Sequence, residues 1–441
     1  MKIWKRFLGI IIILVLVVVQ VLVYSRVVNR KWDEIKYDAF FEQEEDFDVL
    51  FLGSSHVLNG VFPMELWNDY GIVSYNLGGH GCTLSMSYWV LKNALDYTTP
   101  KLVVIDGYFL GRDIKYITEK EYAHITLDAF PLSRTKIDMV NDLCNKREEK
   151  IEFLWEFSLY HNRWSELTEM DFKYEANKEM GAESRIGITQ FEVYSSECGE
   201  CLEGETVGMD YMCKIIELCQ SKNIQVLVTY LPFSGDGWKE ANSLKLITEK
   251  YDVNFINFLE EDIVNDKTDY YDSDSHLNPS GARKVTDYLG RYITEKYSVP
   301  NQKENVAYSE KWNEYYKEYV QLKKDNFAAA EINNQLMLMY DDDFNGGIYV
   351  TDTERFLEES LHRELLLNLG VDLTLLPNEG WSLIYFDNKT GEINYITENN
   401  QAGIELVHKK EHVEIKMNGE ICIVIQTDKG EMAYGFWGEK L

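Results

Sequence analysis

Five short apolar runs alternate with stretches of helical periodicity between residues 47 and 297, and this alternation limits the possible folds more than any other feature. The runs are rich in Val, Ile, Leu and Phe, which is typical of strands buried on both faces. The predicted strands cover residues 48–52, 72–76, 101–106, 224–230 and 253–257, and the predicted helices cover residues 83–97, 206–222, 238–250 and 279–296. This alternation predicts a three-layer α/β fold, with helices on both faces of a parallel sheet.

Three further segments follow from the rest of the chain. Residues 112–205 are too long for a single crossover and are predicted to form a mostly helical insertion. Residues 298–330 carry aromatic side chains at helical spacing, which predicts a linker helix that packs on a neighbouring domain. Residues 331–441 are predicted to form a small, β-rich α+β domain with hairpin turns at 388–391 and 427–430.

The N-terminus carries an apolar segment, residues 7–24, that is interrupted only by Gln20 and is just long enough to cross a bilayer as a helix. It is preceded by basic residues, as at the cytoplasmic end of a span: Lys2, Lys5 and Arg6. No small-residue cleavage site follows it. We therefore predict a single-pass signal anchor in the cell membrane, with residues 1–6 in the cytoplasm, residues 25–46 as a stalk and the rest outside. A cleaved signal peptide and a reversed anchor are the alternatives.

The 441 residues include 44 basic and 74 acidic residues, which gives a formal net charge of −30. This charge excludes a protein that binds nucleic acid by neutralising phosphates over its whole surface, so no nucleic acid is expected as a partner. Aromatic residues make up 13% of the chain. They fit either well-packed cores or flat surfaces on which sugar rings stack, and composition does not choose between the two.

Two patterns in the sequence are candidate metal sites. Cys198 and Cys201 form the only close cysteine pair in the sequence, whereas a zinc ribbon would need a second such pair. Residues 341–352 follow the spacing of a calcium-binding loop, but Asp352 replaces the usual Glu, and a turn between strands has a similar sequence. We therefore expect no metal ion and no cofactor.

Residues with catalytic chemistry follow the predicted strands, where the chemistry of parallel sheets is found. Ser55 stands in the turn from the first strand to a helix-like stretch, a position from which a hydroxyl can attack. Residues 76–81 form a glycine-rich turn whose N–H groups could stabilise an oxyanion. Asp272, Asp274 and His276 come together before the last helix and supply an acid and a base. Each feature alone fits an ordinary turn, but their order at strand ends predicts a serine-dependent active site.

With these motifs, residues 47–297 resemble the SGNH (GDSL-like) hydrolase superfamily. The likeness is greatest to its membrane-anchored branch, which modifies cell-envelope polymers and includes the D-alanyl-lipoteichoic acid and alginate O-acetylation proteins. In that branch Gly-Ser-Ser replaces Gly-Asp-Ser, which implies that the second serine, Ser55, is the nucleophile. The resemblance also implies that His276 is the catalytic histidine and that Gly81, five residues after Asn76, belongs to the oxyanion hole.

The identity of the catalytic aspartate is left open. The superfamily has Asp three residues before its histidine, whereas Ser273 stands there and Asp272 and Asp274 lie on either side. We favour Asp272, because the two tyrosines that precede it could shield it from water and strengthen its interaction with the imidazole. Asp274 lies in mid-turn and could instead cap the helix that starts near Pro279.

Two further predictions concern the surroundings of Ser55. The third strand continues as Asp-Gly-Tyr-Phe-Leu-Gly, without the Asn of the superfamily's third block, so the oxyanion hole would rest on the backbone N–H groups of Ser55 and Gly81. The residues predicted to bind substrate are Asn76, His161, Arg163 and Trp164. The last three lie in the insertion and could form a lid that stacks on sugar and binds an anionic group. A helix docked on the core with an internal cation–π contact is the alternative.

Two classes of function follow. The first is an extracytoplasmic, membrane-anchored Ser-His-Asp acyl esterase or O-acyltransferase that acts on cell-envelope polysaccharide, an acylated glycan or a similar polymer. The second is a non-catalytic protein that holds the polymer for a multispanning membrane acyltransferase. The intact Ser55 and His276 favour the enzyme.

Overall fold

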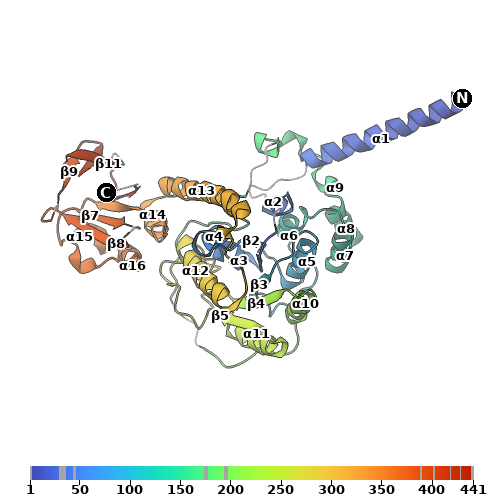
Figure 1. The fold of residues 1–441 in the computed structure, drawn as a ribbon, viewed down its shortest axis with the longest axis horizontal. Coiled ribbons are helices and arrows are strands. Elements are labelled where there is room, and N and C mark those ends of the chain that lie inside the picture. The colour runs from blue at the N-terminus through green and yellow to red at the C-terminus, as the bar shows by residue number, and fades with distance from the viewer. Residues whose placement is uncertain are drawn as a thin grey trace.

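The computed structural model describes residues 2–438 except 29–35, 43–45, 173–176, 193–196, 388–389, 401–402, 418 and 428. At its centre is a five-stranded parallel sheet with the order β2-β1-β3-β4-β5 (Figure 1). The strands are β1 (Val49–Leu52), β2 (Ser74–Asn76), β3 (Leu102–Asp106), β4 (Gln225–Tyr230) and β5 (Asn254–Asn257). This is the strand order of flavodoxin-like sheets, and it contains the five predicted strands.

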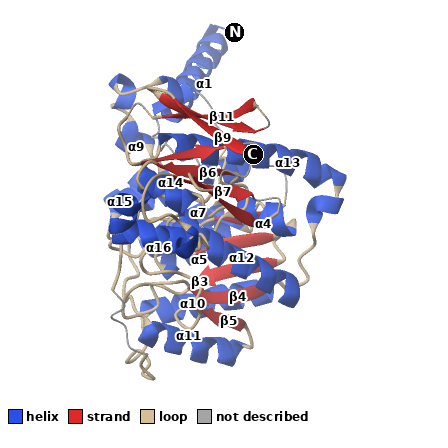
Figure 2. Ribbon diagram, turned by 90° about the vertical axis from the view of Figure 1, so that its left-hand side faces the viewer, coloured by secondary structure: helices blue, strands red, loops and turns tan. Residues whose placement is uncertain are grey.

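Helices cover both faces of the sheet, because successive strand side chains point to opposite faces and both sets are apolar. In β1, Leu50 and Leu52 belong to one core and Val49 and Phe51 to the other. The first face is covered by α5 (Leu84–Ala94), α10 (Val207–Ser221) and α11 (Trp238–Tyr251), and the second by α12 (Pro279–Lys296), which packs on α3 (Ser55–Gly60) and α4 (Pro63–Tyr70). Figure 2 shows β3, β4 and β5 side by side, with these helices around them. The predicted three-layer α/β fold is confirmed.

The N-terminal apolar helix is α1 (Lys2–Val28), which projects from the body (Figure 1). Among the described residues, its segment Trp4–Ser25 is the one helix that is long and apolar enough to cross a membrane. Its side chains are exposed, as those of a lipid-facing helix would be.

The segment expected to be a stalk, residues 25–46, contains a helix that packs on the sheet domain. This helix is α2 (Lys36–Glu42), and it buries Tyr37 and Phe40 in the main core. Phe40 stacks on Phe47, with ring centroids 5.4 Å apart. This part of the segment is therefore not a stalk. Its sequence is polar, but Tyr37 and Phe40 enter a hydrophobic core that other parts of the chain form.

The insertion is helical through residue 172, and its described residues from 177 onward contain no helix until α10. It consists of α6 (Lys120–Leu127), α7 (Arg134–Leu143), α8 (Arg147–Leu154) and α9 (Phe157–Tyr160), followed by 3₁₀ turns η1 (Arg163–Ser165) and η2 (Glu169–Phe172). In Figure 1, α9 lies at the base of α1.

The C-terminal part begins with α13 (Val306–Ala329), which lies where the linker helix was predicted and buries Trp312 and Tyr319 in the main core. Two antiparallel sheets follow, ordered β12-β6-β7-β8 and β11-β10-β9. The elements are α14 (Ile332–Leu338), β6 (Gly346–Val350), α15 (Thr353–Glu358), α16 (Ser360–Asn368), η4 (Leu373–Leu375), β7 (Ser382–Asp387), β8 (Glu392–Thr397), β9 (Ile404–His408), β10 (His412–Met417), β11 (Glu420–Gln426) and β12 (Ala433–Trp437). The predicted β-rich character is confirmed.

Of the two predicted hairpins, one forms. The turn at 388–391, partly outside the described residues, lies between the antiparallel pair β7 and β8. The turn at 427–430 joins β11 to β12, which belong to different sheets, so the hairpin predicted there is wrong. The reason is that β12 pairs with β6, a strand far away in the sequence.

Candidate active site

The turn between β1 and α3 presents Ser55 at the carboxyl end of the sheet. Gly53 has φ +148°, and a Cβ atom there would lie 2.6 Å from Cγ2 of Val57, so this turn requires glycine. The hydroxyl of Ser54 then accepts a hydrogen bond from the backbone N–H of His56 and caps α3. Ser55 is thus the first residue of the helix, and no carbonyl of a preceding helical turn is there to accept a hydrogen bond from its N–H.

Ser55, His276 and Asp272 form a continuous chain of hydrogen bonds. Ser55 Oγ lies 2.7 Å from His276 Nε2. His276 Nδ1 lies 2.8 Å from Oδ2 and 3.0 Å from Oδ1 of Asp272. A hydroxyl, an imidazole and a carboxylate in this order can act as nucleophile, general base and orienting acid.

Asp274 does not contact the ring of His276 in the structure. Its backbone carbonyl accepts a hydrogen bond from His56 Nε2 at 3.2 Å, and its N–H donates to Asp272 Oδ1. Ser275 adopts φ +62°, and this left-handed residue absorbs the extra position between Asp272 and His276. The side chain that caps α12 is Asn278, not Asp274.

His56 belongs to the same group of side chains, although the sequence did not single it out. Its ring centroid lies 4.9 Å from that of His276 and 4.0 Å from that of Tyr108. Burial, followed by the nearby His276, lowers the pKa of His56 to about 3. This imidazole is therefore neutral wherever the fold is intact near neutral pH. The position of His56 directly after Ser55 was the one signal in the sequence that it could belong to the site.

The low pKa of His56 predicts acid sensitivity. The unfolded chain protonates this residue near pH 6.5 and the folded chain only near 3, so the unfolded state binds the additional proton between these values. The free energy of unfolding should therefore fall as pH drops below 6.5, by up to about 1.4 kcal/mol per pH unit from this group. Urea denaturation of the wild type and of His56→Gln at several pH values measures the difference. Equal pH slopes in the two proteins would contradict the assignment.

Asp106, at the end of β3, organises the two loops that cover His56. Its carboxylate accepts hydrogen bonds from the N–H of Tyr108 at 3.0 Å and of Leu231 at 2.8 Å. Burial raises the pKa of Asp106 to about 6, although these hydrogen bonds act to lower it. Tyr108 and Phe233, the aromatic residues of these loops, have ring centroids 5.3 Å apart. Tyr108, which follows β3, thus lies over the site. The end of this strand is where the sequence lacks the superfamily's Asn.

The glycine-rich turn after β2 lies against the first turn, and the hydrogen bonds between them come from Asn76 and Gly79. The buried Asn76 donates both amide hydrogens to α3 and the residue after it, to Val57 O and Val61 O. Its side chain is therefore committed to the turn and does not reach substrate. Gly79 N–H donates to Gly53 O at 3.1 Å. The atoms nearest to a Cβ on Gly81 belong to Glu119 and Tyr122 of the insertion.

A second histidine–carboxylate pair lies at this turn. His80 Nε2 lies 3.0 Å from Oε2 of the buried Glu183, and Arg185 pairs with the same carboxylate. Burial, followed by the charges of Arg185 and Lys36, lowers the pKa of His80 to about 4. No spacing in the sequence links residues 103 positions apart, so this pair was not predicted.

His161, Arg163 and Trp164 lie away from Ser55, at the base of α1. Arg163 donates to Val28 O at 2.9 Å and pairs with Asp171, and the backbone of His161 accepts from Tyr24. Trp164 is exposed. The predicted lid over the active site is therefore not formed by these residues, because the insertion folds toward α1.

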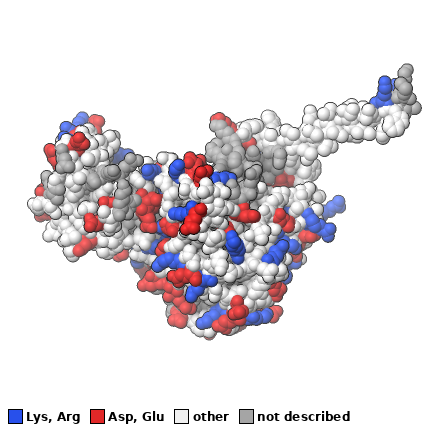
Figure 3. Space-filling view, viewed as in Figure 1, with Lys and Arg blue, Asp and Glu red and all other residues white. Residues whose placement is uncertain are grey.

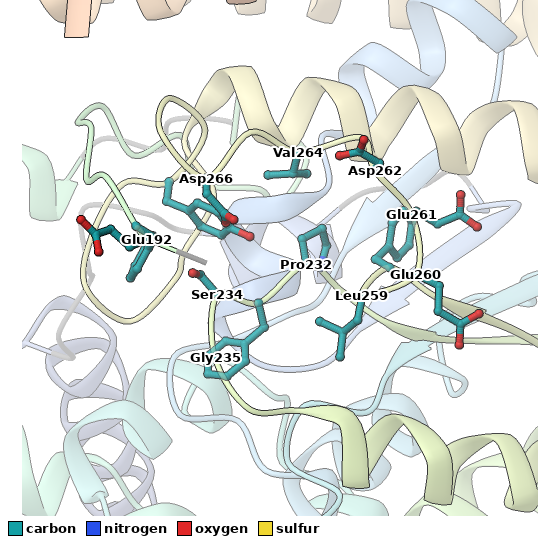
Figure 4. A pocket seen from close by; sticks show the side chains of 14 residues that line it. Glu192, Pro232, Ser234, Gly235, Leu259, Glu260, Glu261, Asp262, Val264 and Asp266 are labelled. Carbon is teal, nitrogen blue, oxygen red and sulfur yellow. The ribbon is translucent and has the colours of Figure 1, made fainter. Parts of the chain in front are cut away.

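A cavity of about 330 Å³ is lined by residues 191–192, 232–235, 258–262, 264, 266 and 270 (Figure 4). Phe233 packs against His56 on one side and lines the cavity on the other. Figure 4 shows Asp266 and Ser234 together on one side of the cavity, and Glu260, Glu261 and Asp262 on the other. The volume is in the range of small-molecule sites.

The calcium-like segment forms an ion-pair cluster. Glu65, Asp341 and Asp343 have oxygen atoms close enough to share an ion. The ammonium of Lys323 lies 2.9, 2.9 and 2.6 Å from carboxylate oxygens of these three residues. Asp352 caps α15 instead, at the far end of β6, so the loop does not close around one centre. The start of the segment connects α14 to β6, so it is a turn between a helix and a strand, not the turn between strands that was the alternative.

Comparison with known proteins gives similarity to solved structures only. No family model matches the chain, and no curated protein matches it. A candidate acylhydrolase from Bacteroides fragilis is 12% identical, with a TM-score of 0.30 over 60% of this chain and 98% of that one. A candidate lipolytic protein of the G-D-S-L family from Desulfitobacterium hafniense is 10% identical, with a TM-score of 0.29 over 55% of this chain and 97% of that one.

A GDSL-like lipase from Bacteroides thetaiotaomicron is 11% identical, with a TM-score of 0.28 over 56% of this chain and 87% of that one. Identities this low carry no activity across to this chain.

Proposed function

We propose that this protein is a serine-dependent esterase or O-acyltransferase. The observation that carries the proposal is the hydrogen-bonded chain from Ser55 through His276 to Asp272, with 2.7 Å and 2.8 Å between successive partners. It stands at the carboxyl end of a parallel sheet, where such folds carry their chemistry.

In the proposed mechanism, Ser55 Oγ attacks the ester carbonyl and forms the new C–O bond, while His276 Nε2 takes the hydroxyl proton. Collapse of the tetrahedral intermediate breaks the bond to the leaving alcohol, to which His276 returns the proton. Asp272 holds the imidazole in place and stabilises its charged form. Water or a sugar hydroxyl then attacks the acyl-enzyme, with His276 again as base, and restores Ser55.

The oxyanion hole is proposed to use the backbone N–H of Ser55, at the start of α3, together with that of Gly81. The neutral His56 contributes no charge beside His276, so the proton that His276 accepts meets no like charge there. The cavity beyond Phe233 offers room for part of the substrate.

The proposed substrate is an acylated cell-envelope polysaccharide or similar polymer outside the membrane, reached by a single-pass protein anchored through α1. The apolar segment Trp4–Ser25 and the basic residues at its N-terminal end support the anchor. A multispanning membrane acyltransferase is the proposed partner if the reaction is transfer.

Labelling of the wild-type protein tests the enzymatic proposal. A fluorophosphonate probe should modify the folded protein at Ser55, because a hydroxyl activated by His276 attacks phosphorus as it attacks an ester. Mass spectrometry identifies the modified residue. A folded wild type that is never labelled and hydrolyses no acetylated polymer would favour the non-catalytic polymer-binding protein.

The proposed topology has its own test. A reporter enzyme that is active only outside the cytoplasm, fused after residue 441, should be active, because the basic N-terminal flank holds that end inside. A reporter that is active only in the cytoplasm, fused at the same place, should be silent. The opposite pattern would overturn the extracytoplasmic location.

A further inference from the structure

The end of α1 is joined to the insertion by direct contacts. The hydroxyl of Tyr24 donates to His161 O at 3.1 Å, and its ring lies edge-on to Phe157 with centroids 5.7 Å apart. Arg163 donates to the last carbonyl of the helix, Val28 O, at 2.9 Å. The segment from α9 to η2 is therefore fixed beside the point where α1 leaves its apolar stretch.

The same segment, together with Trp155 just before it, exposes large apolar side chains. Trp155 is 52% exposed, Leu159 40%, Trp164 66% and Phe172 66%. Tryptophan and other aromatic residues in such numbers are costly to leave in water, and tryptophan is enriched where proteins meet the headgroups of a bilayer. We name this set the docking face and define it by these four residues.

The length of α1 sets the height of the docking face. The 22 residues of Trp4–Ser25 are about 33 Å long at 1.5 Å per residue, close to the thickness of a bilayer's hydrocarbon core. When this segment spans the membrane, Tyr24 and Ser25 reach the headgroups, and His161 and Phe157, which contact Tyr24, lie at the same level. Figure 3 shows α1, on the face in view, as a rod with basic side chains near its free tip.

We propose that the docking face inserts into the headgroup region of the lipid bilayer beside the exit of α1, as a second membrane contact. This proposal rests on the proposed anchoring by α1. Two contacts fix the tilt of the catalytic domain over the membrane, which a single helix followed by a linker would not do.

The charges around the docking face favour apolar contact over attraction to anionic lipid. Arg163 is held by Asp171, and Lys136 is held by Glu156. Glu166 is exposed between Trp164 and Phe172, and the whole chain carries a net charge of −30. Binding should therefore be at least as strong on zwitterionic as on anionic lipid, and added salt should not weaken it.

Fluorophore depth measurements on the full chain test this. The exposed native cysteine is replaced by Cys422→Ser, and an environment-sensitive fluorophore is attached at Trp164→Cys or Phe172→Cys in phosphatidylcholine nanodiscs. Val15→Cys reports on the span, and Leu246→Cys, on α11 far from α1, is the exposed control. The Cys422→Ser protein without a new cysteine gives the labelling background.

We expect lipids with a spin label high on the acyl chain to quench the fluorophore at 164 and 172 by about half, since interfacial side chains sit about 5–10 Å into the boundary. Position 15 should respond to labels near the chain ends, and position 246 to neither. Quenching at 15 with none at 164 and 172 would overturn the docking face and leave the anchor intact. Quenching at no position would overturn both. Protection of 164 and 172 from aqueous iodide without lipid quenching would assign the face to a second copy of the chain, against the proposal.

Discussion

Ser55→Ala is expected to lower kcat for ester hydrolysis by at least about 10⁴-fold, because no other hydroxyl stands at hydrogen-bond distance from His276 Nε2 among the described residues. The change removes one oxygen from a half-exposed position at the start of α3, so the fold should remain intact. Activity on an acetylated model ester and fluorophosphonate labelling both measure the loss.

The neighbouring serine provides a matched control. Ser54 caps α3, so Ser54→Ala should lower the free energy of unfolding by about 1 kcal/mol while labelling and kcat stay within a few-fold of the wild type. If Ser54→Ala abolishes labelling and Ser55→Ala does not, the proposed nucleophile is the wrong serine.

Asp272→Asn is expected to lower kcat by about 10⁴-fold, since an amide in this place can no longer fix the imidazole with its Nδ1 proton inward or stabilise its charged form. KM should change little, because the carboxylate acts through His276 and not on the substrate. Steady-state kinetics with the same ester separates the two parameters.

Asp274→Asn is the control at nearly the same place in the turn. Its side chain is not bonded to His276, and its contribution to the site is the backbone carbonyl that accepts from His56, which the substitution keeps. Activity should therefore stay near that of the wild type. A large loss in Asp274→Asn with Asp272→Asn unaffected would reverse the assignment of the orienting carboxylate.

The fold was predictable because its strands are local signals. The strands β1, β2 and β3 are short and buried on both faces, and all five predicted runs form strands within two residues of the expected bounds. The helices between them follow their own periodicity. Ser55 and His276 were predictable for a related reason: both stand in short motifs at strand ends, and the topology of a parallel sheet brings strand ends together.

Other features depend on partners far away in the sequence. His80 pairs with Glu183, and β12 pairs with β6, only after the chain is folded. Arg163 pairs with Asp171 and the end of α1 and does not reach the active site, which no local pattern shows. The helix α2 was predicted to be part of a polar stalk. Tyr37 and Phe40 enter a core that forms only when the rest of the chain is folded.

The amino-acid sequence by itself determined the α/β layers, the apolar N-terminal helix and the positions of Ser55 and His276, since burial patterns and turn motifs are read from neighbouring residues. The tertiary structure alone decided which aspartate contacts His276. The left-handed conformation of Ser275 turns the chain so that Asp272, four residues away, meets Nδ1. A spacing of one residue is a matter of backbone dihedral angles, and the surrounding fold fixes those angles.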